Sequence, residues 1–221
     1  MDTIFKPVFN SDSGVNMVEK WEKKNQFKPK GLDGISDQQI EYHFETHYNG
    51  YVTKLNEIWE KLPNADRSKA NQNYSEFREL KLEETFNYDG ALLHEVYFQS
   101  LKKEGLKNLS EDLKKKIDED FGSYEKWVED FKATGTAFRG WALLVYDLNT
   151  GKLRNVGADI HNTNGIWNAI VVLALDVYEH AYYVDYGAKR APYLDAFMKN
   201  VDWSSVNHRY EKAHKAYLAF K

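Results

Sequence analysis

Cysteine is missing from this 221-residue sequence. Its absence excludes disulfides, thiolate metal sites, iron–sulfur clusters and a cysteine nucleophile. Any metal bound by the chain must therefore be held by histidine and carboxylate side chains. Nitrogen and oxygen ligands of this kind suit iron, manganese and zinc.

Long apolar runs and an excess of positive charge are missing as well. The longest apolar run, residues 169–175, is far shorter than the roughly 20 residues that cross a bilayer as a helix. The 34 acidic residues outnumber the 30 lysines and arginines, so the basic footprint of a nucleic-acid-binding protein is absent. Residues 1–26 contain no apolar signal-peptide core. We expect a cytoplasmic protein with no membrane or nucleic-acid partner.

Helical periodicity dominates the first half of the chain. Ser36 has an acceptor side chain, and Gln39 follows at the capping-box spacing, so a helix is expected to begin there. Apolar residues then recur at steps of three and four until Pro63. After a polar loop, a second helix is expected over residues 74–101, with an interruption at Asp89–Gly90.

The pattern changes in the second half. Residues 109–134 are typical of one or two helices, with a cap at Ser110 and a break at residues 121–123. After residue 140 the spacing of apolar residues is no longer helical. Three strands are expected at residues 141–146, 153–158 and 169–175. Helix returns over residues 193–221, in two pieces around residues 201–204.

These elements predict an α+β fold. Hydrophobic residues make up 42% of the chain and aromatic residues 15%, enough to build a sizeable core. We expect an N-terminal antiparallel helical hairpin domain over residues 27–105. A C-terminal α/β domain with a small three-stranded antiparallel sheet would follow over residues 106–221. Residues 1–26 are interpreted as an extension, with a short helix around residues 18–21.

Both helices of the expected hairpin carry histidines beside their apolar residues. His43, His47 and Tyr51 fall on one stripe of the first helix. His94 lies among apolar residues of the second, but the zincin motif would need another histidine at position 98, which is Phe98. The alternative for each of these three histidines is a structural role in the core, with a hydrogen-bonding partner.

The strongest local signal follows the third strand. Asp176 stands at its end, and His180 follows four residues later. A carboxylate at a buried strand end is unfavourable unless it is paired or bound to metal. One carboxylate and several imidazoles suit iron or manganese with an open coordination site. The alternative is an Asp–His or Glu–His hydrogen bond that caps a helix.

Several segments together resemble the iron/manganese superoxide dismutases. Asp-Val-Tyr-Glu-His-Ala-Tyr-Tyr at residues 176–183 is similar to the signature of that family. The stretches at residues 43–56, 90–97, 121–124, 140–141, 189–193 and 201–203 resemble further family motifs in the same order. The resemblance extends from about residue 27 to about residue 203.

This resemblance implies a metal site and the residues around it. The ligands of one iron or manganese ion per subunit would be His43, His94, Asp176 and His180. Residues around the site would be Tyr51 at the pocket mouth and Trp141 and Tyr97 on its wall. In a self-associating protein, His47 would bind the partner subunit's Tyr183, and Glu179 would support the partner subunit's His180.

The chain also departs from the family pattern. Phe98 and Tyr178 replace tryptophans that are usual in the family, and residues 1–26 match no counterpart. The glutamine that usually lies near the metal-bound solvent has no equivalent at Gly90, which has no side chain. Similar archaeal-like members have a histidine at the place of His161, so His161 is the candidate for that role here. The alternative is that His161 is an exposed loop histidine.

The implied activity is disproportionation of superoxide to dioxygen and hydrogen peroxide. A local positive charge would attract the anionic substrate, and Arg190 and Lys54 are candidates for it. A zinc-dependent hydrolase that uses the same ligands and a catalytically silent relative are the alternative functions. The sequence leaves iron or manganese open, and dimer or tetramer as well.

Overall fold

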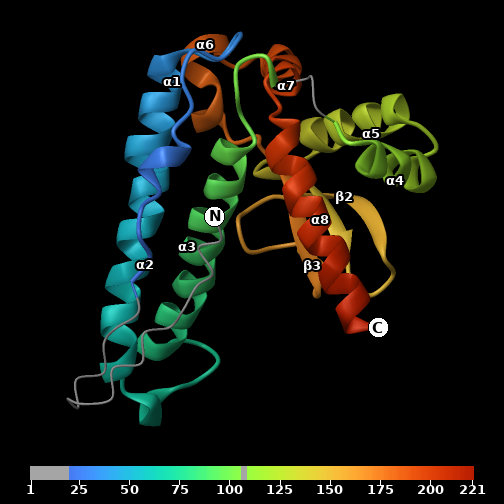
Figure 1. Cartoon of the computed structure of the whole chain (residues 1–221). Coiled ribbons are helices and arrows are strands. Elements are labelled where there is room, and N and C mark those ends of the chain that lie inside the picture. The colour runs from blue at the N-terminus through green and yellow to red at the C-terminus, as the bar shows by residue number, and fades with distance from the viewer. Residues whose placement is uncertain (1–19, 106–108) are drawn as a thin grey trace.

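The computed structural model describes residues 20–105 and 109–221 (Figure 1). A helical hairpin is followed by a pair of helices, a three-stranded sheet and further helices, which confirms the α+β class. The helices are α1 (Asp37–Tyr42), α2 (Asn49–Lys61), α3 (Glu76–Gln99), α4 (Glu111–Phe121), α5 (Tyr124–Ala137), α6 (Tyr183–Tyr186), α7 (Arg190–Lys199) and α8 (Trp203–Phe220). The strands are β1 (Trp141–Asp147), β2 (Lys152–Ala158) and β3 (Ala169–Asp176).

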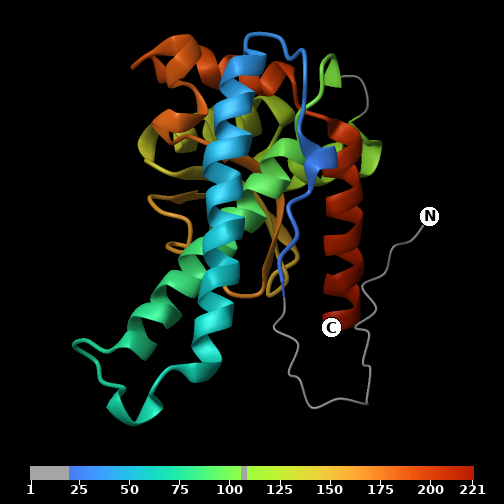
Figure 2. The same ribbon diagram turned by 90° about the vertical axis from the view of Figure 1, so that its left-hand side faces the viewer.

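The first arm of the hairpin is one rod made of three segments. A π-helical turn, His43–Tyr48, joins α1 to α2, and the rod runs beside α3 (Figure 2). Ser36 caps its start, since its Oγ accepts from the backbone N of Gln39 at 3.0 Å. The Gln39 side chain does not complete a capping box, because it bonds to the segment after β3.

The second arm, α3, runs without a break, so the predicted interruption at Asp89–Gly90 is wrong. Gly90 is buried within the helix, and a Cβ there would lie 2.9 Å from the ring of Tyr51. The glycine is therefore explained by the close approach of an aromatic ring from α2. Glycine weakens a helix, but packing of this kind compensates for it.

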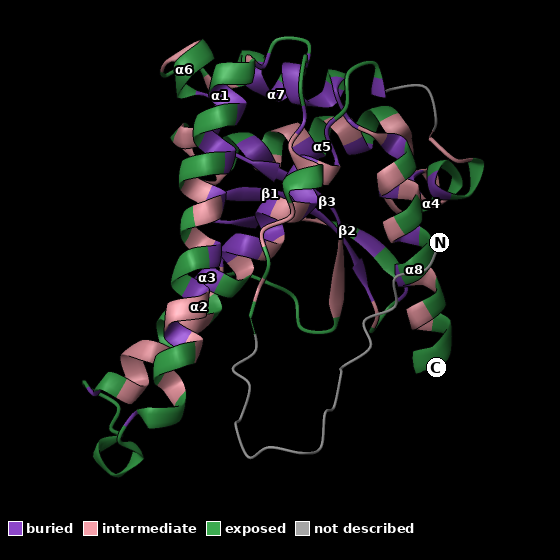
Figure 3. Cartoon of the chain, turned by 60° about the vertical axis from the view of Figure 1, so that its left-hand side comes forward, coloured by how far each residue is buried: buried purple, intermediate pink, exposed green. Residues whose placement is uncertain are grey.

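The sheet has the order β2–β1–β3, and both pairings are antiparallel. Every residue of the central strand β1 is buried, because α5 packs on β1 and β2 while α3 and α8 pack on β3 (Figure 3). The register places Trp141 of β1 opposite Asp176 of β3. The sheet thereby brings the predicted strand-end aspartate to the side where α3 packs.

The C-terminal helices agree with the sequence pattern. The break between α4 and α5 falls at Gly122, whose φ of +90° suits glycine. The expected break between α7 and α8 is present, with Asp202 as the cap of α8. Of the helix expected around residues 18–21, residues 18 and 19 lie outside the described part, and Lys20 and Trp21 are not helical.

Candidate metal centre

The π-helical turn places His43 and His47 at different depths. The His43 side chain is fully buried, and its Nε2 points to the interior. The His47 ring is half-buried and stacks on His180, with centroids 4.1 Å apart. A π-turn inside an α-helix is a rare local distortion that is frequent at functional sites.

His94 enters the same interior from α3. Its Nδ1 lies 2.6 Å from the carbonyl oxygen of Gly90, one helical turn earlier. Because Nδ1 donates to that carbonyl, Nε2 is left as the lone-pair nitrogen. Nε2 is buried and makes no hydrogen bond within the described residues. A buried nitrogen of this kind suits a metal ligand.

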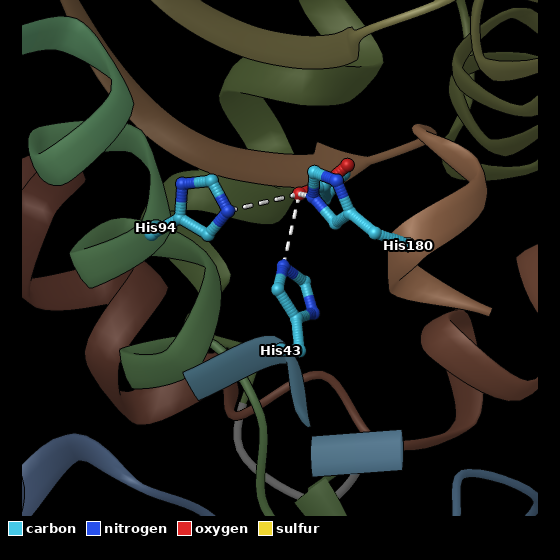
Figure 4. A group of neighbouring side chains, drawn as sticks. His43, His94 and His180 are labelled. Atoms are coloured by element: carbon cyan, nitrogen blue, oxygen red, sulfur yellow. Dashed lines mark hydrogen bonds and ion pairs between the residues drawn. The ribbon is translucent and has the colours of Figure 1, made fainter. Parts of the chain in front are cut away.

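Asp176 is the point on which the histidines converge. Its Oδ2 lies 3.0 Å from Nε2 of His43, 3.0 Å from Nε2 of His180 and 3.3 Å from Nε2 of His94 (Figure 4). Its Oδ1 accepts a hydrogen bond from the backbone N of Tyr178 at 2.9 Å. The four candidate ligand atoms all lie within 4.8 Å of one another. The sequence separates these residues widely, but the fold gathers all four predicted ligands.

The protonation states of the clustered histidines and of Asp176 favour binding of a metal cation. Burial lowers the pKa of His43, and it lowers the pKa of His94 well below the usual value, so both rings are neutral at pH 7. Burial alone would raise the pKa of Asp176, but the charge of His180 and hydrogen bonds from His180 and His43 hold it well below its usual range. The neutral rings of His43 and His94 beside an ionised Asp176 are in the form that binds metal.

His161 lies at the edge of this group rather than in an exposed loop. It is 5% exposed, and its Nδ1 accepts a hydrogen bond from Nε1 of Trp141 at 2.9 Å. The proton of the neutral ring is therefore on Nε2, which is buried and has no partner within the described residues. Burial lowers the pKa of His161 to about 4, which keeps the ring neutral. The structure thus provides an unused N–H donor beside the ligands.

Aromatic rings surround His161 and the ligands. Tyr51 meets the His161 ring edge-on at 4.6 Å, and Tyr178 lies 5.1 Å from it. Tyr178 also stacks on His180 at 5.1 Å, and the buried Phe98 lies 5.0 Å from His43. The two residues that replace family tryptophans therefore still contribute to the aromatic wall.

Two residues support the candidate ligands although the sequence predicted no role for them at the site. The Tyr193 hydroxyl donates to the backbone oxygen of Asp176 at 2.7 Å and lies 3.1 Å from the Tyr97 hydroxyl. The Gln39 amide nitrogen donates to the backbone oxygen of His180 at 2.5 Å. Both residues are fully buried, and their chain positions alone give no sign of these distant partners.

Of the residues predicted at a subunit interface or a charged entrance, Glu179, Tyr183 and Lys54 are exposed, whereas His47 and Arg190 are partly buried. Glu179 is exposed, and Tyr183 is 55% exposed. Arg190 donates from Nη1 to the backbone oxygens of Phe138, at 2.6 Å, and Gly135, at 3.1 Å. Its guanidinium is thus fixed at the end of α5, while Lys54 is exposed and pairs with a glutamate on its own helix.

Among residues 20–105 and 109–221, no helix has the length and apolar character needed to pass through a membrane.

Comparison with known proteins covers both halves of the chain. Residues 26–102 match the alpha-hairpin domain of iron/manganese superoxide dismutases, and residues 109–209 match the C-terminal domain of the same family. An iron superoxide dismutase of Aquifex pyrophilus is 56% identical over 207 residues, which cover 92% of this chain and 97% of the relative. A manganese superoxide dismutase of Halobacterium salinarum is 41% identical over 179 residues, covering 81% and 88%. The chain therefore belongs to the iron/manganese superoxide dismutase family.

Proposed function

We propose that this chain is an enzyme that disproportionates superoxide to dioxygen and hydrogen peroxide, with one iron or manganese ion held by His43, His94, Asp176 and His180. The observation that carries this proposal is the convergence of three Nε2 atoms on one buried carboxylate oxygen. Three imidazoles and one carboxylate are a ligand set that suits iron or manganese with a coordination position left for solvent or substrate.

The protein's own groups would handle the protons. Iron or manganese bound at this site supplies the one-electron oxidation of one superoxide and the one-electron reduction of the next, and the second half-reaction consumes two protons. His161 would donate its Nε2–H toward the ligand cluster, because Trp141 occupies the other ring nitrogen. Burial raises the pKa of Tyr51, so its hydroxyl stays protonated and is available as a donor at the pocket mouth.

Arg190 would contribute attraction for the anionic substrate. Its guanidinium is fixed beside Tyr182, whose ring stacks on Tyr193. The Tyr193 hydroxyl in turn donates to the backbone oxygen of Asp176, so two aromatic rings connect Arg190 to the metal centre. A fixed cation there would draw superoxide inward although the net charge of the chain is −4.

Metal exchange tests the function against a zinc-dependent hydrolase and a catalytically silent relative. The purified protein is analysed for metal, stripped with a chelator and reloaded separately with iron, manganese and zinc. We expect dismutase activity with iron, manganese or both, and none with zinc, because zinc has no accessible second oxidation state. Stoichiometric binding of all three metals without dismutase activity would contradict the proposal.

We further propose that the protein is a cytoplasmic homo-oligomer built on a two-fold dimer. His47, Glu179 and Tyr183 would form the interface, with His47 contacting the partner subunit's Tyr183 and Glu179 contacting the partner subunit's His180. A two-fold axis makes each of these contacts twice. The burial that lowers the pKa of His47 to about 4 supports a neutral ring able to accept a hydrogen bond.

Glu179→Ala is expected to weaken the dimer. Loss of one partner from a buried charged pair costs roughly 2 kcal/mol or more, or about thirtyfold in the dissociation constant. Analytical ultracentrifugation over a dilution series would measure the shift toward monomer. Glu129→Ala, which removes an exposed glutamate from α5, is the matched control. A wild-type protein that is monomeric at micromolar concentration with full activity would refute the interface.

A further inference from the structure

A short segment ahead of the hairpin makes contacts that the proposed chemistry does not use. Residues 20–28, called the strap here, run along the outside of α2 and α3 (Figures 1 and 2). Most of the strap precedes residue 26, where the match to the alpha-hairpin domain of the family begins. Its contacts are therefore largely additional to those of the matched domain.

Trp21 fastens the strap to both helices of the hairpin. Its backbone N donates to Oδ1 of Asn56 at 2.8 Å, and Nδ2 of Asn56 donates back to the Trp21 carbonyl at 3.0 Å. Its indole Nε1 donates to Oε1 of Glu95, on α3, at 2.6 Å. The indole also meets the ring of Tyr88 edge-on at 4.9 Å. One residue thus bridges α2 and α3.

The same glutamate oxygen links the strap to the π-helical turn. The Tyr48 hydroxyl donates to Oε1 of Glu95 at 2.8 Å and accepts from the backbone N of Lys24 at 2.9 Å. Lys28 pairs with Glu45 at 2.9 Å. The strap therefore holds side chains of the π-turn through one of its backbone N–H groups and through a lysine side chain.

Two of these anchor points, Glu95 and the π-turn, are close in the chain to a proposed metal ligand. Glu95 directly follows His94, and the π-turn held through Tyr48 begins with His43. The Tyr48 ring also lies nearly parallel to the His94 ring, with centroids 6.5 Å apart and an interplanar angle of 18°. A π-turn is a rare local departure from α-helical geometry, and here the strap contacts it from outside.

We infer that the strap is a clamp that positions His43 and His94 for metal binding, through the Trp21–Glu95–Tyr48 hydrogen bonds. These are positioning residues, since none of them touches the site where metal or substrate would lie. The inference rests on the ligand set proposed above. If the clamp loosens, the two imidazoles gain freedom and the metal leaves more readily, because supporting hydrogen bonds of this kind maintain ligand geometry.

Trp21→Phe tests the clamp, since it keeps an aromatic ring against Tyr88 but removes the indole N–H. We expect metal loss to an excess of chelator to become about tenfold faster. The electron paramagnetic resonance spectrum of the metal-loaded protein should also broaden. Glu95→Ala should have a similar effect, and the double variant should be little worse than either single one, because both remove the same link. Glu95→Gln keeps an acceptor oxygen and should largely restore slow release.

Two controls separate positioning from general stability. Lys20→Ala breaks the exposed Lys20–Glu60 pair of the strap and should leave metal release unchanged. Val206→Ala truncates a fully buried side chain in α8 and should lower the melting temperature without faster release. Unchanged release and an unchanged spectrum in Trp21→Phe would overturn the clamp but leave the ligands in place. Metal retention in His94→Ala would instead overturn the ligand set.

Discussion

Asp176→Ala is expected to leave the protein without bound metal and without dismutase activity. The Asp176 carboxylate is the anionic member of the four-residue cluster, and its Oδ2 is the atom nearest to all three imidazoles. Loss of a supporting hydrogen bond alone lowers metal affinity by about 10–100-fold, so loss of a ligand should lower it by at least about a hundredfold. Metal content by mass spectrometry and dismutase activity after reconstitution provide the measurement.

His94→Ala should give the same result, because it removes a proposed neutral ligand that comes from α3 rather than from the end of β3. His208→Ala removes an exposed histidine of α8 and should keep both metal and activity. Circular dichroism would establish that all three variants retain their helices. Stoichiometric metal in either Asp176→Ala or His94→Ala would show that the ligand assignment is wrong.

His161→Ala is expected to keep the metal and yet lower turnover by about 10–100-fold. The variant lacks the N–H donor that Trp141 orients, so the reduction potential of the bound metal should shift as well. His161→Gln places an amide donor at the same position and should retain appreciable activity. Redox titration and pulse-radiolysis kinetics would measure the two effects.

Thr163→Ala is the matched control for His161, because it alters the same loop without reaching the ligands. The Thr163 hydroxyl lies 3.4 Å from the backbone oxygen of Ile160, at the outside of the loop. Its turnover and potential should equal those of the wild type. If His161→Ala also matched the wild type in both, the donor near the open coordination position would have to be another residue.

Local patterns in the sequence predicted the fold well. Ser36 and Ser110 both accept hydrogen bonds as helix caps, and the three strands lie within one residue of their expected bounds. These features depend on neighbours a few residues away, which is the range that periodicity and capping describe. The predicted break at Asp89–Gly90 failed because Gly90 is required by the ring of Tyr51, from a different helix.

The proposed ligands were named from the sequence, but through family resemblance rather than through their spacing. Only Asp176 and His180 are close in the chain, whereas His43 and Asp176 are separated by 133 residues. Gln39 was expected to cap its own helix and instead holds the backbone of His180. A capping pattern cannot reveal a competing partner that the fold brings in from a distance.

The sequence by itself determined which chemistry is available: with no cysteine, a metal can be held only by histidine and carboxylate, and the helix and strand periods distribute those residues over separate elements. Only the tertiary structure decided which atoms face one another. The antiparallel sheet places Asp176 opposite Trp141, and the same tryptophan fixes the proton of His161 on Nε2. The hairpin brings Nε2 of His43 and of His94 to one oxygen. These choices depend on packing between distant elements, which no local pattern encodes, because burial and hydrogen bonding are satisfied by the fold as a whole.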